Sequence, residues 1–181
     1  MEANVRTRWD ISWRDADEWQ HAVAMLSSFF RTRTDDAQPL RLAALRVKML
    51  IDAIDSFIQE QTAVVCPWCT DVCCIDRHGA FDLHDLIYAF ALDLPLPHYS
   101  HDHREIDPCR FLDASGCRLV RWQRPFRCTW HFCDALIKHM HNLPAKKVRG
   151  FNAAFQELLA ARAEMLTAFE HIVQKRKQQH H

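Results

Sequence analysis

The sequence has little glycine, with only Gly79, Gly116 and Gly150 among 181 residues. A phosphate-binding loop or a dinucleotide fingerprint needs several glycines close together in the chain, so these three exclude both motifs. The chain also lacks an excess of either charge, because 23 basic residues balance 23 acidic ones. Proteins that bind nucleic acid normally carry a basic excess. We therefore expect no nucleic-acid partner.

Long hydrophobic runs are absent as well. The longest candidate, residues 86–97, is interrupted by Asp93, Pro95 and Pro97. A helix that spans a bilayer needs roughly 18 or more mostly apolar residues, so we expect no membrane partner. Residues 1–15 also lack the basic-then-apolar order of a secretion signal. Together these absences predict a cytoplasmic protein.

Cysteine is confined to the middle of the chain. Residues 1–62 contain none, residues 63–133 contain all eight, and residues 134–181 again contain none. The two outer zones show the apolar spacing of helices, whereas the middle zone is mixed. We therefore expect a mainly α fold, in which residues 1–181 form a single compact helical domain. An irregular cysteine-rich segment lies between its flanking N-terminal and C-terminal helices.

The helices are expected at five places. The first covers residues 15–32, with Asp15 or Asp17 as its cap. The second begins at Pro39 and ends at about Gln61, with its apolar side made by Leu42, Leu45, Met49, Ile54, Phe57 and Ile58. Residues 62–65 are expected as a short strand. Further helices are expected over 81–92, with Asp82 and Asp85 as a capping box, from near Trp130, and after Pro144.

The cysteines are Cys66, Cys69, Cys73, Cys74, Cys109, Cys117, Cys128 and Cys133. In a reducing cytoplasm, so many thiols are typical of metal ligands or redox groups rather than of structural disulfides. A thioredoxin-like dithiol needs only two cysteines and alternating strands and helices around them, which the helical flanks of Cys66 and Cys69 do not predict. We therefore favour metal binding through all eight thiols.

Zinc and an iron–sulfur cluster are the two metal interpretations. A tetrahedral zinc site can take Cys66 and Cys69 as one pair and Cys128 and Cys133 as the other, which leaves half of the thiols unused. Adjacent Cys73 and Cys74 are awkward in one tetrahedral site, because neighbouring side chains of an extended chain point opposite ways. We favour an iron–sulfur cluster of the 4Fe–4S type, which needs thiolates converging from separate segments. Zinc remains the alternative.

Basic and aromatic residues surround the later cysteines. Thiolate sites carry negative charge, which Arg124 and Arg127 can stabilise by hydrogen bonds. Trp68 and Trp130 flank cysteines directly and are expected to shield the thiols from water. His131 can replace one thiolate as a ligand, and His78 and His84 are weaker candidates of the same kind. His98, His101 and His103 are more typical of a solvated loop.

The middle zone resembles a known family. The order CPWCTDVCC, CRFLDASGCRLVRWQRPFRC and HFC, over residues 66–133, is similar to the YkgJ or CxxCxxCC cysteine-cluster family, which is described as chelating zinc or iron. The resemblance includes all eight cysteines in order and Arg124-Pro125 before Cys128. The family usually has two residues between its second and third cysteines, whereas three residues separate Cys69 from Cys73 here. The resemblance implies a metal-chelating domain.

The expected function follows from the metal. We expect electron transfer, redox sensing or an accessory role to another enzyme, with a protein partner that the sequence does not identify. The alternative is a zinc-stapled protein-interaction module, in which the metal folds the irregular segment. A third hypothesis, methyl transfer, is implied only by the similar domain of flagellin lysine methylases, and the chain has no glycine-rich site for S-adenosylmethionine. No catalytic residue is predicted.

Overall fold

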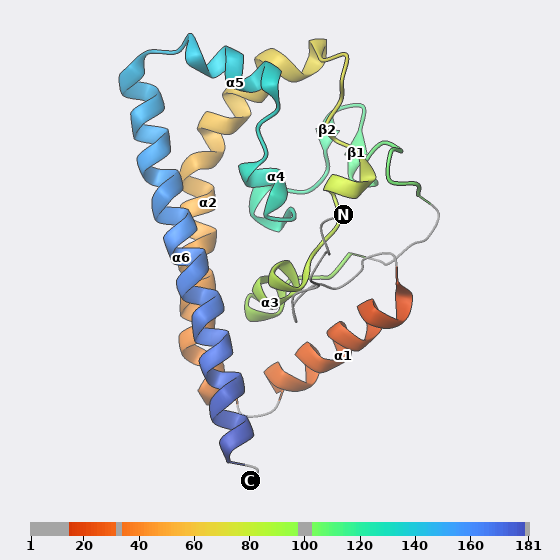
Figure 1. Ribbon diagram of the computed structural model, residues 1–181, viewed down its shortest axis with the longest axis vertical. Coiled ribbons are helices and arrows are strands. Elements are labelled where there is room, and N and C mark those ends of the chain that lie inside the picture. Colours follow the sequence, from red (N-terminus) through yellow and green to blue (C-terminus); the bar gives the residue numbers. More distant parts are fainter. Residues whose placement is uncertain (1–14, 32–33, 98–102, 180–181) are drawn as a thin grey trace, which may run out of the picture.

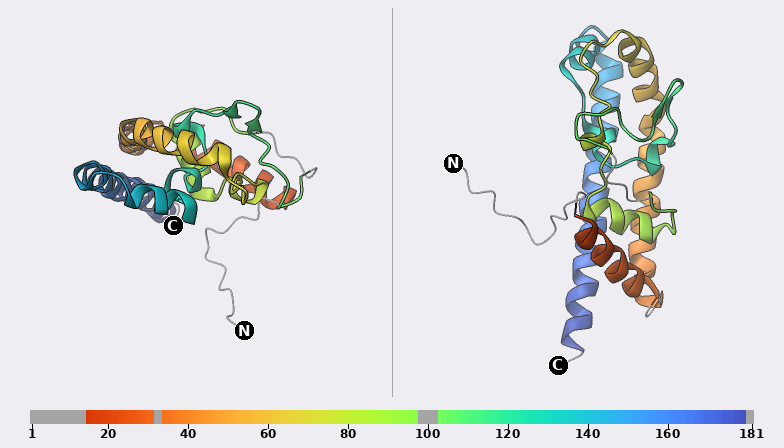
Figure 2. Two further views of the ribbon diagram at one scale, coloured as in Figure 1. Left: turned by 90° about the horizontal axis from the view of Figure 1, so that it is seen from above. Right: turned by 90° about the vertical axis from the view of Figure 1, so that its right-hand side faces the viewer.

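Two long helices organise the fold. The computed structural model describes residues 15–31, 34–97 and 103–179, and in it α2 (Gln38–Val65) and α6 (Ala145–Gln178) lie side by side and antiparallel (Figure 1). Their contact includes the stacked rings of Phe57 and Phe151, whose centroids are 4.4 Å apart. The smaller elements lie on one side of this pair (Figure 2). The expected mainly α fold is confirmed.

Helix α1 (Ala16–Arg31) begins where the sequence predicts. The Asp15 carboxylate accepts hydrogen bonds from the backbone N–H groups of Asp17 and Glu18, at 2.9 and 3.1 Å, so Asp15 is the cap. The buried side is a helical stripe made by Trp19, Ala22, Leu26 and Phe30. A short helical turn, η1 (Thr34–Ala37), then leads into α2, and α1 packs across α3 (Leu83–Ala91).

The buried side of α2 differs from the prediction. Its fully buried apolar residues are Leu40, Ala44, Val47, Ile51, Ile54 and Ile58. Leu42, Leu45 and Met49 face solvent instead, and Met49 is 69 % exposed. Two residues along an α-helix are about 200° apart, so Leu40 and Leu42 lie on opposite sides. The prediction combined two apolar stripes of α2. Only the stripe that contains Ile54 and Ile58 packs on the core.

This correction predicts different stabilities for two substitutions on α2. Ile54→Val removes one buried methyl group and should lower the free energy of unfolding by about 1 kcal/mol. Met49→Ala acts on an exposed side chain and should change it by less than about 0.5 kcal/mol. Urea denaturation of the two variants measures both values. A larger loss for Met49→Ala would contradict the burial pattern.

Residues 62–65 are helical, so the expected strand is wrong. Helix α2 continues through them to Val65, and the Thr62 hydroxyl donates a hydrogen bond to the Ile58 carbonyl at 2.9 Å. The β-branched residues favour a strand only where a neighbouring strand is present to pair with. Here the helix turns directly into η2 (Cys66–Trp68), so the first two cysteines follow the end of α2.

The helices of the middle segment agree with the prediction at α3 and are shorter than predicted at the last cysteines. The expected capping box of α3 is confirmed by reciprocal hydrogen bonds between Asp82 and Asp85. The helix expected near Trp130 is two helices, α4 (Arg127–Trp130) and α5 (Asp134–His141), separated by an extended stretch. Cys128 therefore lies within α4, while Cys133 stands at the N-terminal end of α5.

The rest of the middle segment is largely irregular, as expected. It contains the short turns η3 (Asp76–His78) and η4 (Arg121–Gln123). It also contains an antiparallel hairpin of two-residue strands, β1 (Leu112–Asp113) and β2 (Gly116–Cys117). Gly116 has a φ of 115°, which L side chains rarely adopt, so glycine suits this hairpin turn. No helix in the described ranges is long and apolar enough to cross a membrane.

Candidate functional site

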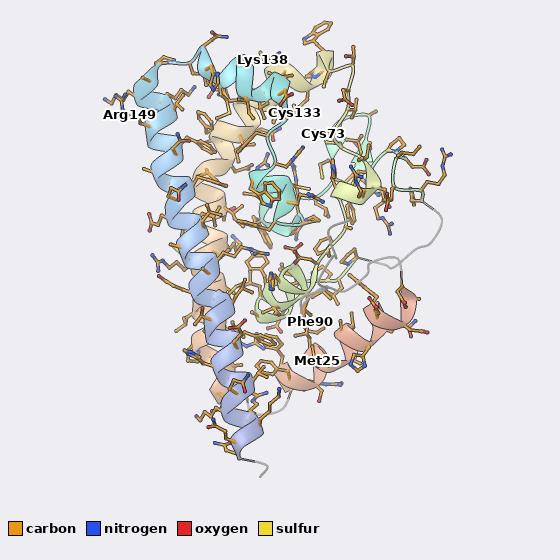
Figure 3. All side chains as sticks on the ribbon, in the orientation of Figure 1. Met25, Cys73, Phe90, Cys133, Lys138 and Arg149 are labelled. Atoms are coloured by element: carbon orange, nitrogen blue, oxygen red, sulfur yellow. The ribbon has the colours of Figure 1, made fainter. Side chains whose placement is uncertain are left out.

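The eight cysteines come from four parts of the chain that meet beside the upper half of the α2–α6 pair. These parts are the end of α2, the segment before η3, the β1–β2 hairpin and the α4–α5 region (Figure 1). Figure 3 labels Cys73 and Cys133, which lie close together in that view although they are distant in sequence. All eight cysteines are free thiols, and none is fully buried. They divide into two groups.

Group A consists of Cys66, Cys69, Cys73 and Cys133. The Cys69 backbone N–H donates to the Cys66 carbonyl at 3.2 Å, which turns the chain so that the first two thiols stay together. The Cys74 thiol and burial raise the pKa of Cys73, and the Cys133 thiol opposes that rise, so Cys133 lies near Cys73. The pKa of Cys66 is raised by burial and by the negative charges that Cys73, Cys133 and Cys69 carry when ionised. Cys66 therefore lies near each of the other three thiols of group A.

Helix α5 brings Cys133 to group A. His139 Nε2 is 3.0 Å from Gln61 Oε1, a contact that ties α5 to the last turns of α2. Nearby, the Lys147 ammonium group at the start of α6 donates to both carboxylate oxygens of Glu60 at 2.7 Å. These contacts hold α5 and the start of α6 against the C-terminal end of α2, which Cys66 follows directly.

Group B consists of Cys74, Cys109, Cys117 and Cys128. The Cys109 N–H donates to the Cys74 carbonyl at 3.0 Å, next to a bridge between Ile75 and Pro108. Cys117 pairs with Leu112 in the hairpin, and the Leu112 N–H donates to the Cys109 carbonyl at 2.8 Å. The hairpin therefore begins and ends beside a cysteine of this group.

Cys128 joins group B through the turn after η3. Its sulfur is 3.8 Å from the His78 carbonyl oxygen, and the Cys109 sulfur lies against the adjacent Gly79. A Cβ atom at Gly79 would stand only 2.5 Å from that sulfur, so the close approach requires glycine. Burial, followed by the charges of Cys109 and Cys117, raises the pKa of Cys128 to about 12. Sequence analysis missed Gly79, although glycine is rare in this chain and this one follows the first four cysteines closely.

The adjacent cysteines connect the two groups. Interaction between the two neighbouring thiols raises the pKa of Cys73 and lowers the pKa of Cys74. The charges of Cys128, Cys66 and Cys109 also act on the pKa of Cys74, so Cys74 lies near thiols of both groups. The zinc pairing of Cys66 and Cys69 with Cys128 and Cys133 stays a prediction, and Cys128 lies at the same turn, residues 78–79, as Cys109.

The donor chemistry fits a thiophilic metal, but the side chains are not closed around one. Thiolates are the ligands that zinc and iron–sulfur clusters prefer, and eight free thiols stand within two neighbouring groups. Within the described ranges, however, no three Cys, His, Asp or Glu side chains are placed to hold an ion together. Metal binding at either group therefore requires thiols to change rotamer or their segments to draw closer.

Two ion pairs fix the irregular segment, one within the segment and one between the segment and α2. Arg110 donates from Nε and Nη2 to both carboxylate oxygens of Asp76, at 2.9 and 2.8 Å, and the Asp76 side chain has no exposed surface. Buried Arg121 donates to Asp55 at 2.5 Å and to the Cys128 carbonyl at 3.1 Å. Asp55 thus secures a cysteine-bearing segment to α2. An aspartate on a helix surface gives no sequence signal for this role.

The predicted surrounding residues have different positions. The charge of Arg124 lowers the pKa of Cys128 against the effect of burial, and Arg124 Nε donates to the Leu119 carbonyl at 2.9 Å. The Arg127 guanidinium lies 5.7 Å from the centre of the Trp130 ring. Trp68 is 85 % exposed and Trp130 is 43 % exposed. Trp68 therefore projects into solvent, against the expectation that it shields the thiols, whereas Trp130 is only partly exposed and packs beside His131.

The exposure of Trp68 predicts that its removal has little effect. Trp68→Ala should change the free energy of unfolding by less than about 0.5 kcal/mol, because an exposed side chain loses little packing. It should also leave the metal content of the purified protein unchanged. Denaturation and elemental analysis check the two parts. Loss of metal in this variant would show that the ring protects the thiols after all.

Two of the predicted histidines lie between the groups. His78 and His131 have ring centroids 5.1 Å apart, and His78 Nδ1 is 2.8 Å from the Cys73 carbonyl oxygen. Burial and the charges of His78 and Arg127 lower the pKa of His131, which favours the neutral ring that binds metals. His84 lies on α3 and His103 in a loop, while His98 and His101 lie outside the described residues.

A pocket lies away from the thiols, at the other end of the fold. It has a volume of about 440 Å³ and is lined by Met25, Leu26, Phe29, Phe169, Val173, Arg176 and Lys177. In Figure 3, Met25 marks its position on α1, far below Cys73 and Cys133. The pocket and the cysteines are therefore separate features of the molecule.

Comparisons with protein-family models, with curated proteins and with solved structures give no match to this chain. The resemblance of residues 66–133 to the YkgJ cysteine-cluster family therefore stays a prediction. The functional argument depends on the thiols themselves and on the segments that position them.

Proposed function

We propose that this protein is a metal-binding cysteine-cluster protein that carries an iron–sulfur cluster of the 4Fe–4S type. The observation that carries the proposal is the gathering of eight free thiols from four segments of the chain. Iron–sulfur clusters take thiolate ligands from separated segments, and adjacent cysteines are compatible with ligands that point to different places. The resemblance to the YkgJ family supports the same conclusion.

The position of the thiols favours an exchange of electrons with a protein partner. All eight are at least partly accessible, so a cluster held there would lie near the surface of the molecule. Solvent exposure and nearby charges tune the potential of such clusters. We therefore propose electron transfer, redox sensing or an accessory role to another enzyme, carried out in the cytoplasm.

A zinc-stapled interaction module is the second candidate. The observation that favours it is the scarcity of regular structure between α3 and α4, where the strands are only two residues long. A structural metal can fold such a segment, because binding energy then contributes directly to folding. In this case the metal supports a binding surface and has no redox role.

Colour separates the two candidates. Protein purified without oxygen should absorb in the visible range and bleach on addition of dithionite if it carries an iron–sulfur cluster. A zinc protein is colourless and does not respond to the reductant. A colourless preparation that contains zinc would overturn the iron–sulfur proposal and support the interaction module.

A further inference from the structure

We infer that the eight cysteines form two separate four-thiolate metal sites, group A with Cys66, Cys69, Cys73 and Cys133, and group B with Cys74, Cys109, Cys117 and Cys128. This inference rests on the proposed function, since it assigns the ligands of the metal that the function requires. Four thiolates complete a tetrahedral zinc site and also match the ligand number of one iron–sulfur cluster.

The backbone supports the assignment of group B. Cys109 is tied to Cys74 by a 3.0 Å hydrogen bond and to the hairpin that ends at Cys117. The sulfur atoms of Cys109 and Cys128 both contact the turn at residues 78–79. Each of the four cysteines is therefore placed by contacts within the irregular segment, and the Asp76–Arg110 ion pair fixes that segment internally.

Group A is placed by a different part of the fold. Cys66 and Cys69 follow the last turn of α2, and Cys133 stands at the start of α5, which is tied to α2 through Gln61 and His139. Cys73 lies near Cys133, as Figure 3 shows, and the Cys133 thiol acts on the pKa of Cys73. The group therefore depends on the packing of α5 against α2 rather than on the hairpin.

The division also accounts for the adjacent cysteines. The backbone of Cys74 is tied to Cys109 by the 3.0 Å hydrogen bond, whereas Cys73 lies near Cys133, so we assign the adjacent cysteines to different tetrahedral sites. As members of two sites that share a border, both can act as ligands. Each site would bind one divalent ion while its four thiol protons pass to solvent.

The test is a titration of Co²⁺ into the reduced, metal-free full-length protein under argon, followed by thiolate-to-cobalt absorption and by equilibrium dialysis. We expect the wild type to saturate at two ions per chain. Cys69→Ser and Cys117→Ser should each retain one ion and about half of the absorption. The decisive variants carry two cysteine substitutions each. Cys69→Ser with Cys133→Ser should still bind one ion, whereas Cys69→Ser with Cys117→Ser should bind none.

Gly79→Ala provides a variant that keeps every thiol. The added methyl group displaces only the Cys109 sulfur, so binding of one ion should weaken while the other is unchanged. Circular dichroism checks that each variant is folded. The two-site inference would be overturned if the wild type bound only one ion, or if the Cys69 and Cys133 double variant lost both ions. Neither result would contradict the proposed function. A wild type that binds no Co²⁺ would overturn the proposed function as well.

Discussion

Replacing Arg110 by leucine should lower the free energy of unfolding by about 3–5 kcal/mol. The substitution removes both N–H donors of the Asp76 carboxylate, whose side chain is fully enclosed, and a buried charge without its partner is strongly destabilising. Metal retention at Cys74 and Cys109 should fall as well, because Asp76 and Arg110 each follow one of these cysteines closely in sequence. Urea denaturation of reduced protein at pH 7 measures the stability change.

Arg104→Leu is the matched control in the same segment. Arg104 pairs with Asp107, but its side chain is 78 % exposed, and such surface pairs contribute little to stability because water screens them. The double variant Asp76→Leu with Arg110→Leu should regain part of the stability, since it leaves no buried charge. Equal losses for Arg104→Leu and Arg110→Leu would mean that the buried pair has no special importance.

Replacing Arg162 by methionine should lower the free energy of unfolding by an amount that depends on pH. Arg162 Nη2 is 3.3 Å from Asp85 Oδ1, and the guanidinium lies 4.2 Å from the centre of the Phe126 ring. Burial, together with the charge of Asp82, raises the pKa of Asp85 to about 7, and Arg162 opposes that rise. The loss should be about 3 kcal/mol at pH 8, where Asp85 is ionised, and about 1 kcal/mol at pH 5, where it is protonated.

The direction of this pH dependence follows from the protonated and ionised states of Asp85. The folded protein holds this proton up to about pH 7, whereas the unfolded chain releases it near the ordinary value of 3.8. The unfolding free energy therefore decreases between those values as the pH rises, and removing Arg162 extends the decrease above pH 7. Arg46→Met, which breaks an exposed pair with Glu164, should lose the same small amount at both pH values. A loss for Arg162→Met that does not change with pH would contradict this account.

Helix boundaries were predictable where local chemistry decides them. Asp15 caps α1, Asp82 and Asp85 cap α3, and α6 begins just after Pro144. These signals act over a few residues, so they can be read without knowledge of the fold. The apolar side of α2 was not predictable in the same way, because two apolar stripes compete and only packing against α6 selects the one that contains Val47 and Ile54.

The division of the thiols also depends on long-range contacts. Spacing in the sequence suggests that Cys128 and Cys133 act together, yet α4 ends between them and α5 carries Cys133 toward Cys66. Likewise, the buried pair of Arg121 with Asp55 joins residues that are far apart in the chain, and neither residue has a local signal. The cysteines were therefore identifiable as a site, whereas their grouping required the tertiary structure.

The most direct test is the metal and acid-labile sulfide content of protein purified without oxygen. The proposal predicts iron and sulfide in equal amounts, at about four of each for every cluster. Two clusters per chain would agree with the two thiol groups as well. Protein that retains neither iron nor zinc, and that does not take up iron and sulfide when both are supplied under reducing conditions, would contradict the claim that these cysteines bind a metal.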